Sequence, residues 1–237
     1  MEKNKVNILS TRPLSGSVIQ EVLDNGIMID VQSFIEVEPI LNGTTINKIK
    51  ETGKQEHTVV ITSMNTVEFL AKHIHPPLNW KIYCIGNTTK QLVNQLLGEG
   101  LLAGTAEDAD HLADQIIADK ISSVLFFCGD IRRDDLPNKL KNNDVSVEEV
   151  IIYKTIEMDV NINVNYSGIL FFSPSAVRSY FKHNKVTGET VLFSIGNTTT
   201  KEIKSFVNNK VVTAKETDKE SLVKQMIQYF NEKIIEA

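Results

Sequence analysis

The pentapeptide Ile-Gly-Asn-Thr-Thr occurs twice in the chain, starting at residue 85 and again at residue 195, an offset of 110 positions. The same offset places 59–73 (VVITSMNTVEFLAKH) over 169–183 (ILFFSPSAVRSYFKH), so that Ser63 aligns with Ser173. A similarity that persists at one offset through several elements is typical of two copies of one structural unit. The sequence therefore predicts two similar halves.

Each half alternates short apolar runs with helical patterns, which is typical of βα units and a parallel sheet. Ten strands are too many for one small sheet, and two five-stranded parallel sheets flanked by helices fit better. The fold class predicted is α/β with two similar domains. Expected strands lie near 6–10, 27–31, 58–62, 81–85, 101–103, 123–128, 145–151, 168–172, 190–195 and 210–213. Expected helices lie at 15–24, 44–53, 65–73, 88–97, 109–119, 133–142, 175–183, 198–207 and 219–234.

The second copy runs out of chain before it can match the last βαβ piece of the first copy, 124–150. Residues 7–31 have the same strand, polar turn, helix and strand, so they supply the missing piece. This predicts that a continuous domain, 41–149, is inserted into a split domain built from 1–33 and 165–237. The two crossings, 34–40 and 150–158, are rich in β-formers and are expected to pair as a two-stranded connector, a plausible hinge.

Charge and composition exclude several classes of function. The net charge is −5, from 25 basic and 30 acidic residues, and no basic block suited to nucleic acid is present. No apolar run approaches the length of a membrane span, and the N-terminus does not read as a targeting signal. Cys84 and Cys128 lie inside apolar segments, which favours buried thiols in a reducing compartment and hence the cytoplasm. A monomer is expected, because no additional apolar helix face stands out.

Polar turns follow six of the expected strands, at 10–13, 62–65, 86–89, 128–130, 173–176 and 196–199. Ligands of parallel α/β sheets bind where strands end and helices begin. Free N–H groups in a first helical turn can hold a carboxylate without Lys or Arg. Two interpretations remain open, since Ser, Thr and Asn also occur at helix starts as caps alone. If three turns of each domain face one interdomain cleft, the chain binds a molecule with many carboxylates.

Other signatures of chemistry are absent from the sequence. No GxGxxG motif follows a strand and no phosphate-binding GxxxxGK[ST] motif occurs. His73 and His75 have no third ligand nearby, so a surface helix end is favoured over a metal site. The acidic residues Asp108, Asp110 and Asp114 suggest a solvated helix face. No nucleophile is paired with a base, so covalent catalysis has no candidate.

Together the motifs resemble the uroporphyrinogen-III synthase family, the cofactor-free enzymes that cyclise the linear tetrapyrrole hydroxymethylbilane. The resemblance is carried by STRP at 10–13, TSMNTV at 62–67, FSPSAV at 172–177 and both IGNTT segments. It is also carried by CGDIRRDDLP at 128–137, VEEVIIYKT at 147–155 and TAKETDKESLVKQM at 213–226. These segments span nearly the whole chain in the order typical of the family.

The resemblance implies a substrate with eight carboxylates, no cofactor and no metal, and a tetrapyrrole product with ring D inverted. It implies that Tyr153 is catalytic, as a hydrogen-bond or proton donor to the departing hydroxyl, and that Thr89, Thr199 and Ser63 lie near the substrate. Transient contact with the preceding enzyme would protect an unstable substrate. The substrate-binding set expected from the turns and the resemblance is Thr11, Arg12, Ser63, Asn65, Gly86, Asn87, Thr88, Thr89, Gly129, Arg132, Ser173, Ser175, Ala176, Gly196, Thr198 and Thr199.

Alternatives to this interpretation stay open at the level of sequence. The chain could be a non-catalytic two-domain protein that binds or senses a small anion, or a diverged and inactive synthase domain used for protein contacts. Tyr153 could instead be a connector residue that packs one domain on the other. Product analysis with hydroxymethylbilane separates the catalytic interpretation from the others.

Overall fold

The computed structural model describes residues 6–235, with side chains as far as Glu232. The chain forms two compact units, unit 1 from Met1–Glu36 with Ile156–Ala237, and unit 2 from Val37–Thr155. The split domain predicted from sequence extends to residues 1–5 and 236–237, and these lie outside the described residues. Among residues 6–235, no helix has the length and apolar character needed to cross a bilayer.

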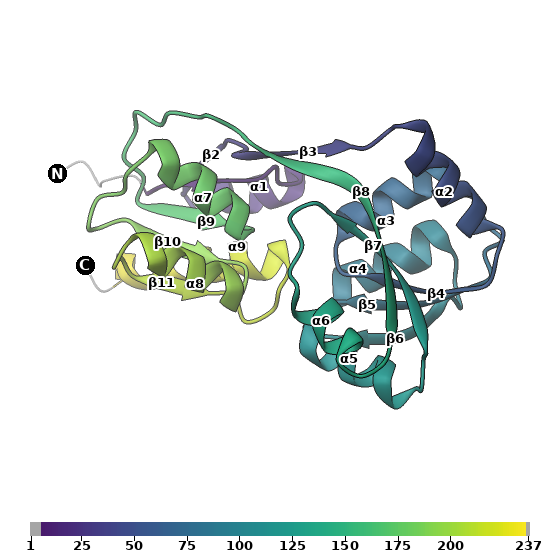
Figure 1. Cartoon of the computed structure of the whole chain (residues 1–237). Coiled ribbons are helices and arrows are strands. Elements are labelled where there is room, and N and C mark those ends of the chain that lie inside the picture. The colour runs from purple at the N-terminus through teal and green to yellow at the C-terminus, as the bar shows by residue number, and fades with distance from the viewer. Residues whose placement is uncertain (1–5, 236–237) are drawn as a thin grey trace. The chain divides into compact units, whose positions relative to one another are not determined.

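Unit 1 contains a five-stranded sheet in the order β11-β10-β9-β1-β2, with every neighbouring pair parallel. β1 pairs with β9 although they are far apart in sequence, with Ile8 opposite Gly168, and Figure 1 shows the purple N-terminal strands in one sheet with the green ones. Its elements are β1 (Asn7–Ser10), α1 (Gly16–Asp24), β2 (Met28–Val31), β9 (Gly168–Phe171), α7 (Pro174–His183), β10 (Val191–Ser194), α8 (Asn197–Phe206), β11 (Val211–Thr213) and α9 (Lys219–Ile235).

Helices cover both faces of the unit 1 sheet, and the inner strands β9 and β10 are buried at every position rather than at alternate ones. On one face, Val22 of α1 and Met226 of α9 pack in one buried cluster with Phe193 of β10. On the other face, Val177 of α7 and Ile203 of α8 pack with further strand residues.

Unit 2 contains a six-stranded sheet in the order β3-β8-β7-β4-β5-β6. The pairs among β8, β7, β4, β5 and β6 are parallel. Its elements are β3 (Ile35–Pro39), α2 (Gly43–Gly53), β4 (His57–Ile61), α3 (Met64–His73), β5 (Trp80–Ile85), α4 (Asn87–Leu92), the π-helix η1 (Val93–Leu97), β6 (Leu102–Ala106), α5 (Ala109–Ala118), β7 (Ser123–Gly129), α6 (Asp135–Lys141) and β8 (Ser146–Glu157).

The unit 2 sheet is also covered on both faces. Ile49 of α2 and Leu70 of α3 pack with Phe127 of β7 in one buried cluster. Ile116 of α5 and Leu140 of α6 pack with strand residues in a second cluster. These two layers of helices place the ends of the strands, and the turns that follow them, at the rim of the unit.

Two crossings of the chain connect the units, and they lie in β3 and β8. Ile40 N donates to Ile152 O at 2.9 Å and Met158 N donates to Phe34 O at 2.9 Å, which makes this pair antiparallel. The sequence suggested a strand at 145–151 and a separate connector at 150–158. In the structure both are parts of the single strand β8, so the fifth parallel strand of unit 2 continues directly into the connector.

Each expected strand and helix has a counterpart in the structure, with boundaries that differ by a few residues. One helix differs in kind. The segment expected as a helix at 88–97 begins as α4 and continues as the π-helix η1.

Candidate functional site

The predicted turns follow neighbouring strands in each unit. In unit 2, Ser63, Gly86 and Gly129 come directly after or at the end of β4, β5 and β7, and these strands are adjacent to one another and to β8. Because parallel strands end at the same edge of a sheet, these turns line one edge of unit 2. In unit 1, the turns after β1, β9 and β10 line the corresponding edge.

Tyr153 lies on β8 at the level where β7 ends, and it belongs to the buried core of unit 2. The side chain packs against Gly129, where a Cβ atom would lie 2.3 Å from the ring Cε2. The ring can occupy this position only because residue 129 has no side chain. The ring also covers the α-carbon of Gly129 on that side, so a substrate cannot reach that carbon there. Tyr153 is 8% exposed.

Two hydroxyl groups from the start of α3 face the Tyr153 phenol. Burial raises the pKa of Tyr153, and the Ser63 and Thr66 hydroxyls partly offset that rise by favouring the anionic form. Ser63 also caps α3, since its hydroxyl accepts from Asn65 N at 3.3 Å. Thr66 is fully buried, and its Oγ1 lies near the phenol but outside hydrogen-bonding geometry with it or with any other described group, so its effect on the Tyr153 pKa is smaller than that of Ser63. The net effect keeps the phenol protonated, so it can donate a hydrogen bond.

The two identical pentapeptides adopt different conformations. Gly86 has φ +82°, in the left-handed region, and a Cβ there would meet nothing within 4 Å. Gly196 has φ 177°, which is ordinary extended backbone, and a Cβ there would lie 3.1 Å from Cγ2 of Thr217. In both turns no side chain caps the helix that follows. The first turn of the helix after Gly86 is thus open beside its glycine, whereas Thr217 crowds Gly196.

The last threonine of the pentapeptide is placed alike in the two units, whereas the one before it is not. Thr89 and Thr199 are buried, at 5% and 2% exposure, while Asn87 is exposed. Thr88 is half-buried and Thr198 is exposed. The predicted role of the two buried threonines therefore requires a ligand that approaches their backbone more than their hydroxyls.

In unit 1, the structure gives several predicted binding residues internal partners. Thr11 Oγ1 donates to Leu170 O at 2.7 Å and ties β1 to β9. The Ser173 hydroxyl caps α7 by accepting from Ala176 N at 3.1 Å. Ser175 is buried and accepts from Arg178 Nη2 at 3.2 Å. Ala176 is 1% exposed, and Arg12 is half-buried directly after Thr11.

Arg132 follows β7 and is engaged by carboxylates of the protein itself. Its guanidinium pairs with Glu149 on β8 and with Asp134. Lys141 Nζ contacts the same Glu149 at 3.0 Å. To bind a substrate carboxylate, Arg132 would have to exchange one of these partners.

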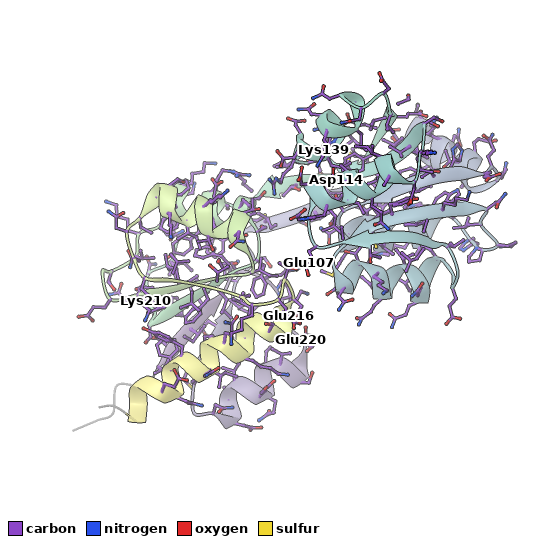
Figure 2. The ribbon with its side chains drawn as sticks, turned by 90° about the horizontal axis from the view of Figure 1, so that it is seen from below. Glu107, Asp114, Lys139, Lys210, Glu216 and Glu220 are labelled. Carbon is purple, nitrogen blue, oxygen red and sulfur yellow. The ribbon has the colours of Figure 1, made fainter. Side chains whose placement is uncertain are left out.

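The acidic helix face expected on α5 is exposed, and two of its carboxylates form ion pairs with a lysine of α6. Lys139 of α6 contacts Asp114 at 2.7 Å and Asp110 at 2.8 Å, and Figure 2 shows Lys139 beside Asp114. Asp108 caps α5 by accepting from His111 N at 2.9 Å. In the part of the chain that the structure describes, no group of three or more His, Cys, Asp or Glu residues is arranged to hold a metal ion.

Sequence reasoning missed three residues at the Tyr153 end of the sheet. Thr66 lies one helical turn after Ser63, a spacing that places both on one face of α3 and that the TSMNTV motif displays. Asp130 follows β7 and accepts from Thr155 N of β8, and Glu149 of β8 pairs with Arg132. These last two contacts join β8 to the loop after β7, and the sequence holds no signal for them.

Comparison with known proteins gives the following relationships. Residues 17–224 match the family model described as "Uroporphyrinogen-III synthase HemD". Uroporphyrinogen-III synthase of Saccharomyces cerevisiae is 34% identical over 120 residues, which are 42% of this chain and 43% of the yeast protein. An uncharacterized protein of Rickettsia prowazekii is 27% identical over 139 residues, 59% of this chain and 47% of that protein. The matched segments thus span less than half the length of these curated relatives.

Two solved structures share the fold. A mutant uroporphyrinogen III synthase from the extreme thermophile Thermus thermophilus aligns with a TM-score of 0.65 at 10% identity, over 96% of this chain and 99% of that one. The uroporphyrinogen-III synthetase of Helicobacter pylori aligns with a TM-score of 0.61 at 12% identity, over 94% and 99%. At this identity the likeness concerns the fold, and it confirms the α/β class with parallel sheets flanked by helices.

Proposed function

Since the chain belongs to the uroporphyrinogen-III synthase family, as its motifs predicted, we propose that it converts hydroxymethylbilane to uroporphyrinogen III with loss of water and inversion of ring D. The reaction makes it a cyclising hydro-lyase of heme or siroheme biosynthesis, acting without a cofactor. The observation that carries the proposal beyond family membership is the placement of Tyr153. It lies buried beside Ser63 and Thr66 at the end of the sheet where α/β proteins bind ligands.

The reaction needs a proton or hydrogen-bond donor more than a nucleophile. The terminal C–O bond of hydroxymethylbilane breaks, the hydroxyl leaves as water after gaining a proton, and the electron pair of the pyrrole nitrogen forms an azafulvene. The substituted carbon of ring D attacks the azafulvene and gives a spiro intermediate. The bond from that carbon to the bridge from ring C then breaks, which leaves an azafulvene on ring C. The free α-carbon of ring D attacks this bridge and loses its proton, so the macrocycle closes with ring D inverted and the proton used to release water is returned. The phenol of Tyr153, or a water it holds, donates to the departing hydroxyl. Because burial raises its pKa, Tyr153 stays protonated at neutral pH.

The reaction also runs spontaneously to the wrong isomer, so the protein must control the geometry of a flexible chain. Holding the reacting ends together is proximity catalysis. We assign this task to the turns of both units, with the predicted set named above as carboxylate contacts. The first helical turns after Gly86 and Gly196 lack a side-chain cap, which leaves main-chain N–H groups for carboxylates. Arg12 supplies a basic side chain in the turn after β1.

We also place the enzyme in the cytoplasm, in transient contact with the preceding enzyme. Cys84 and Cys128 are free, buried thiols whose pKa burial raises to about 11, a state suited to the reducing cytoplasm. Transient contact with the enzyme that supplies hydroxymethylbilane would shorten the life of the free substrate.

Product analysis tests the function. The purified chain is given hydroxymethylbilane, the products are oxidised to porphyrins, and the type I and type III isomers are separated. We expect type III well above the spontaneous background, and in Tyr153→Phe a large fall in type III formation with type I restored. Ser205→Ala, at an exposed position on α8, is the control and should behave as wild type.

Three outcomes are distinguishable. Type I alone from the wild-type chain refutes the synthase and leaves a protein that binds anions without chemistry. Full type III formation by Tyr153→Phe refutes the role of the phenol but keeps the enzyme. Binding of uroporphyrinogen III without its formation identifies an inactive synthase domain.

A further inference from the structure

The pairing of β8 with β7 shifts by one residue directly before Tyr153. Cys128 lies opposite Ile151, whereas the next residue, Gly129, lies opposite Tyr153. Ile152 is therefore an extra residue, as in a β-bulge. Neighbours in a regular strand point to opposite faces, yet Ile152 and Tyr153 both lie in the buried cluster under α3. The bulge is what turns the Tyr153 side chain toward Ser63 and Thr66.

Asp130 binds the backbone of β8 directly after this bulge, at residues 153 and 155. Its backbone N donates to Tyr153 O at 3.1 Å. Its carboxylate Oδ1 accepts from Thr155 N at 2.9 Å, two residues further along β8, and from Ile131 N at 2.8 Å. β7 ends at Gly129, so the carboxylate takes the place of the strand carbonyl that β8 would otherwise lack. Asp130 is itself exposed, so packing in the core does not account for it.

Gly129 lies directly against the aromatic ring of Tyr153. A Cβ atom at this position would lie 2.3 Å from Cε2, 2.6 Å from Cζ and 3.0 Å from Cδ2 of Tyr153. Real side chains do not approach so closely, so the aromatic ring would have to move. Cζ carries the hydroxyl, and a displaced ring carries the hydroxyl with it.

From these contacts we propose that Asp130 and Gly129 are positioning residues for Tyr153, Asp130 by fixing the bulge and Gly129 by leaving room for the ring. The proposal rests on the proposed function, since that function assigns Tyr153 to the reaction. The proposal requires that β8 can pair with β7 in two registers. If the bulge relaxes, Gly129 pairs with Ile152 and the Tyr153 side chain turns to the opposite face of the sheet. Asp130 stabilises the bulged register by gripping residues 153 and 155.

The position of the ring can be measured without any assay of activity. The full chain is labelled with 3-fluorotyrosine, and the ¹⁹F resonance that disappears in Tyr153→Phe is assigned to residue 153. We expect Asp130→Ala and Gly129→Ala to shift or split that resonance while the other tyrosine resonances stay in place. Asp130→Asn keeps an oxygen that can accept both hydrogen bonds, so it should restore the wild-type position. Gly43→Ala is the matched control, because a Cβ there meets nothing within 4 Å.

Isomer analysis then connects position to chemistry. Loss of hydrogen bonds to a charged group predicts a fall in the rate of type III formation on the order of tenfold in Asp130→Ala. In the Tyr153→Phe background the same change should alter the rate by less than about twofold, because Asp130 acts through Tyr153. A residue with a merely structural role would lower both rates alike.

An unchanged Tyr153 resonance in Asp130→Ala overturns the proposal, and so does an equal loss of rate in both backgrounds. If Gly129→Ala fails to fold, the exposed Asp130 variants still decide the question. If the wild-type chain forms no type III product, the proposed function fails, while the ¹⁹F measurement still shows whether these two residues hold the ring.

Discussion

Replacing Thr66 by valine should stabilise the protein, although the residue is a fully buried polar one in a helix next to the proposed catalytic tyrosine. Its Oγ1 is buried and lies outside hydrogen-bonding geometry. A buried hydroxyl without a partner costs about 1–3 kcal/mol relative to its hydrated state in the unfolded chain. Valine has nearly the same shape and carries no hydroxyl. We expect Thr66→Val to raise the free energy of unfolding by about 1 kcal/mol, at the low end of that range because some strain accompanies the change.

Thr52→Val is the matched control in the same unit. Thr52 is also buried and helical, but its Oγ1 donates to Ile49 O at 2.8 Å. Removing this satisfied hydroxyl loses a hydrogen bond, so Thr52→Val should lower the free energy of unfolding by about 1 kcal/mol. The two substitutions are chemically identical, and opposite signs isolate the effect of the partner.

Urea unfolding followed by tryptophan fluorescence measures both variants. Trp80 is the only tryptophan in the sequence and is buried in the core of unit 2, so its signal reports the unit that contains both threonines. A change of about 1 kcal/mol moves the midpoint by about 0.5 M urea at an m-value of about 2 kcal/mol/M. If Thr66→Val destabilises as much as Thr52→Val, the Thr66 hydroxyl has a partner and the reasoning is wrong. The stabilised variant should also form less type III product, because it loses a hydroxyl that faces Tyr153.

Burial works to raise the pKa of Glu149, but hydrogen bonds and charges of two basic side chains outweigh it and hold that pKa below its ordinary value. A carboxyl whose pKa is lowered in the native state adds stability above its ordinary pKa of about 4.5, and that stability is lost as the pH falls through the lower native pKa. Glu149→Gln should therefore lose less unfolding free energy than wild type between about pH 6 and about pH 3 in urea titrations. Gly86→Ala should cost about 1 kcal/mol of stability, because φ there is +82°. Gly196→Ala should cost less, because φ is 177° and the new Cβ meets only Cγ2 of the exposed Thr217, which has to give way slightly; equal losses by urea unfolding would contradict this difference between the turns. Difference absorbance between wild type and Tyr153→Phe should show no ionisation of Tyr153 below about pH 10, since burial raises its pKa; ionisation near neutral pH would remove it as a proton donor.

Periodicity and the internal repeat predicted the elements of both sheets, because apolar patterns are local and the offset compares one half of the chain with the other. They also predicted that 34–40 and 150–158 pair as a connector. They could not predict the register in which β8 pairs with β7. A bulge at Ile152 adds one residue to one strand, and nothing in IIYKT distinguishes a bulged strand from a regular one.

The repeat predicts two similar halves, yet its two identical pentapeptides differ in backbone conformation. Gly86 and Gly196 differ because their neighbours differ. β11 ends at Thr213 and α9 begins at Lys219, while β6 ends at Ala106 and α5 begins at Ala109, so unit 1 has a longer loop, and Thr217 in that loop crowds Gly196. Similarly, the pairing of Arg132 is decided by a residue on another strand. Such contacts depend on tertiary structure, which one sequence does not reveal.

The antiparallel pair of β3 and β8 changes the entropy of closing unit 1. Strand β1 must find the central strand β9 across more than 150 residues of chain, with Ile8 opposite Gly168. The free-energy cost of closing a flexible loop grows with the logarithm of its length. Once unit 2 has folded and Phe34 is bonded to Met158, the flexible chain left between β2 and β9 consists of two short segments, 32–34 and 158–167. Folding of the insert thereby shortens the effective loop, so substitutions that weaken β3 or β8 should slow the folding of unit 1, whose own residues they leave intact.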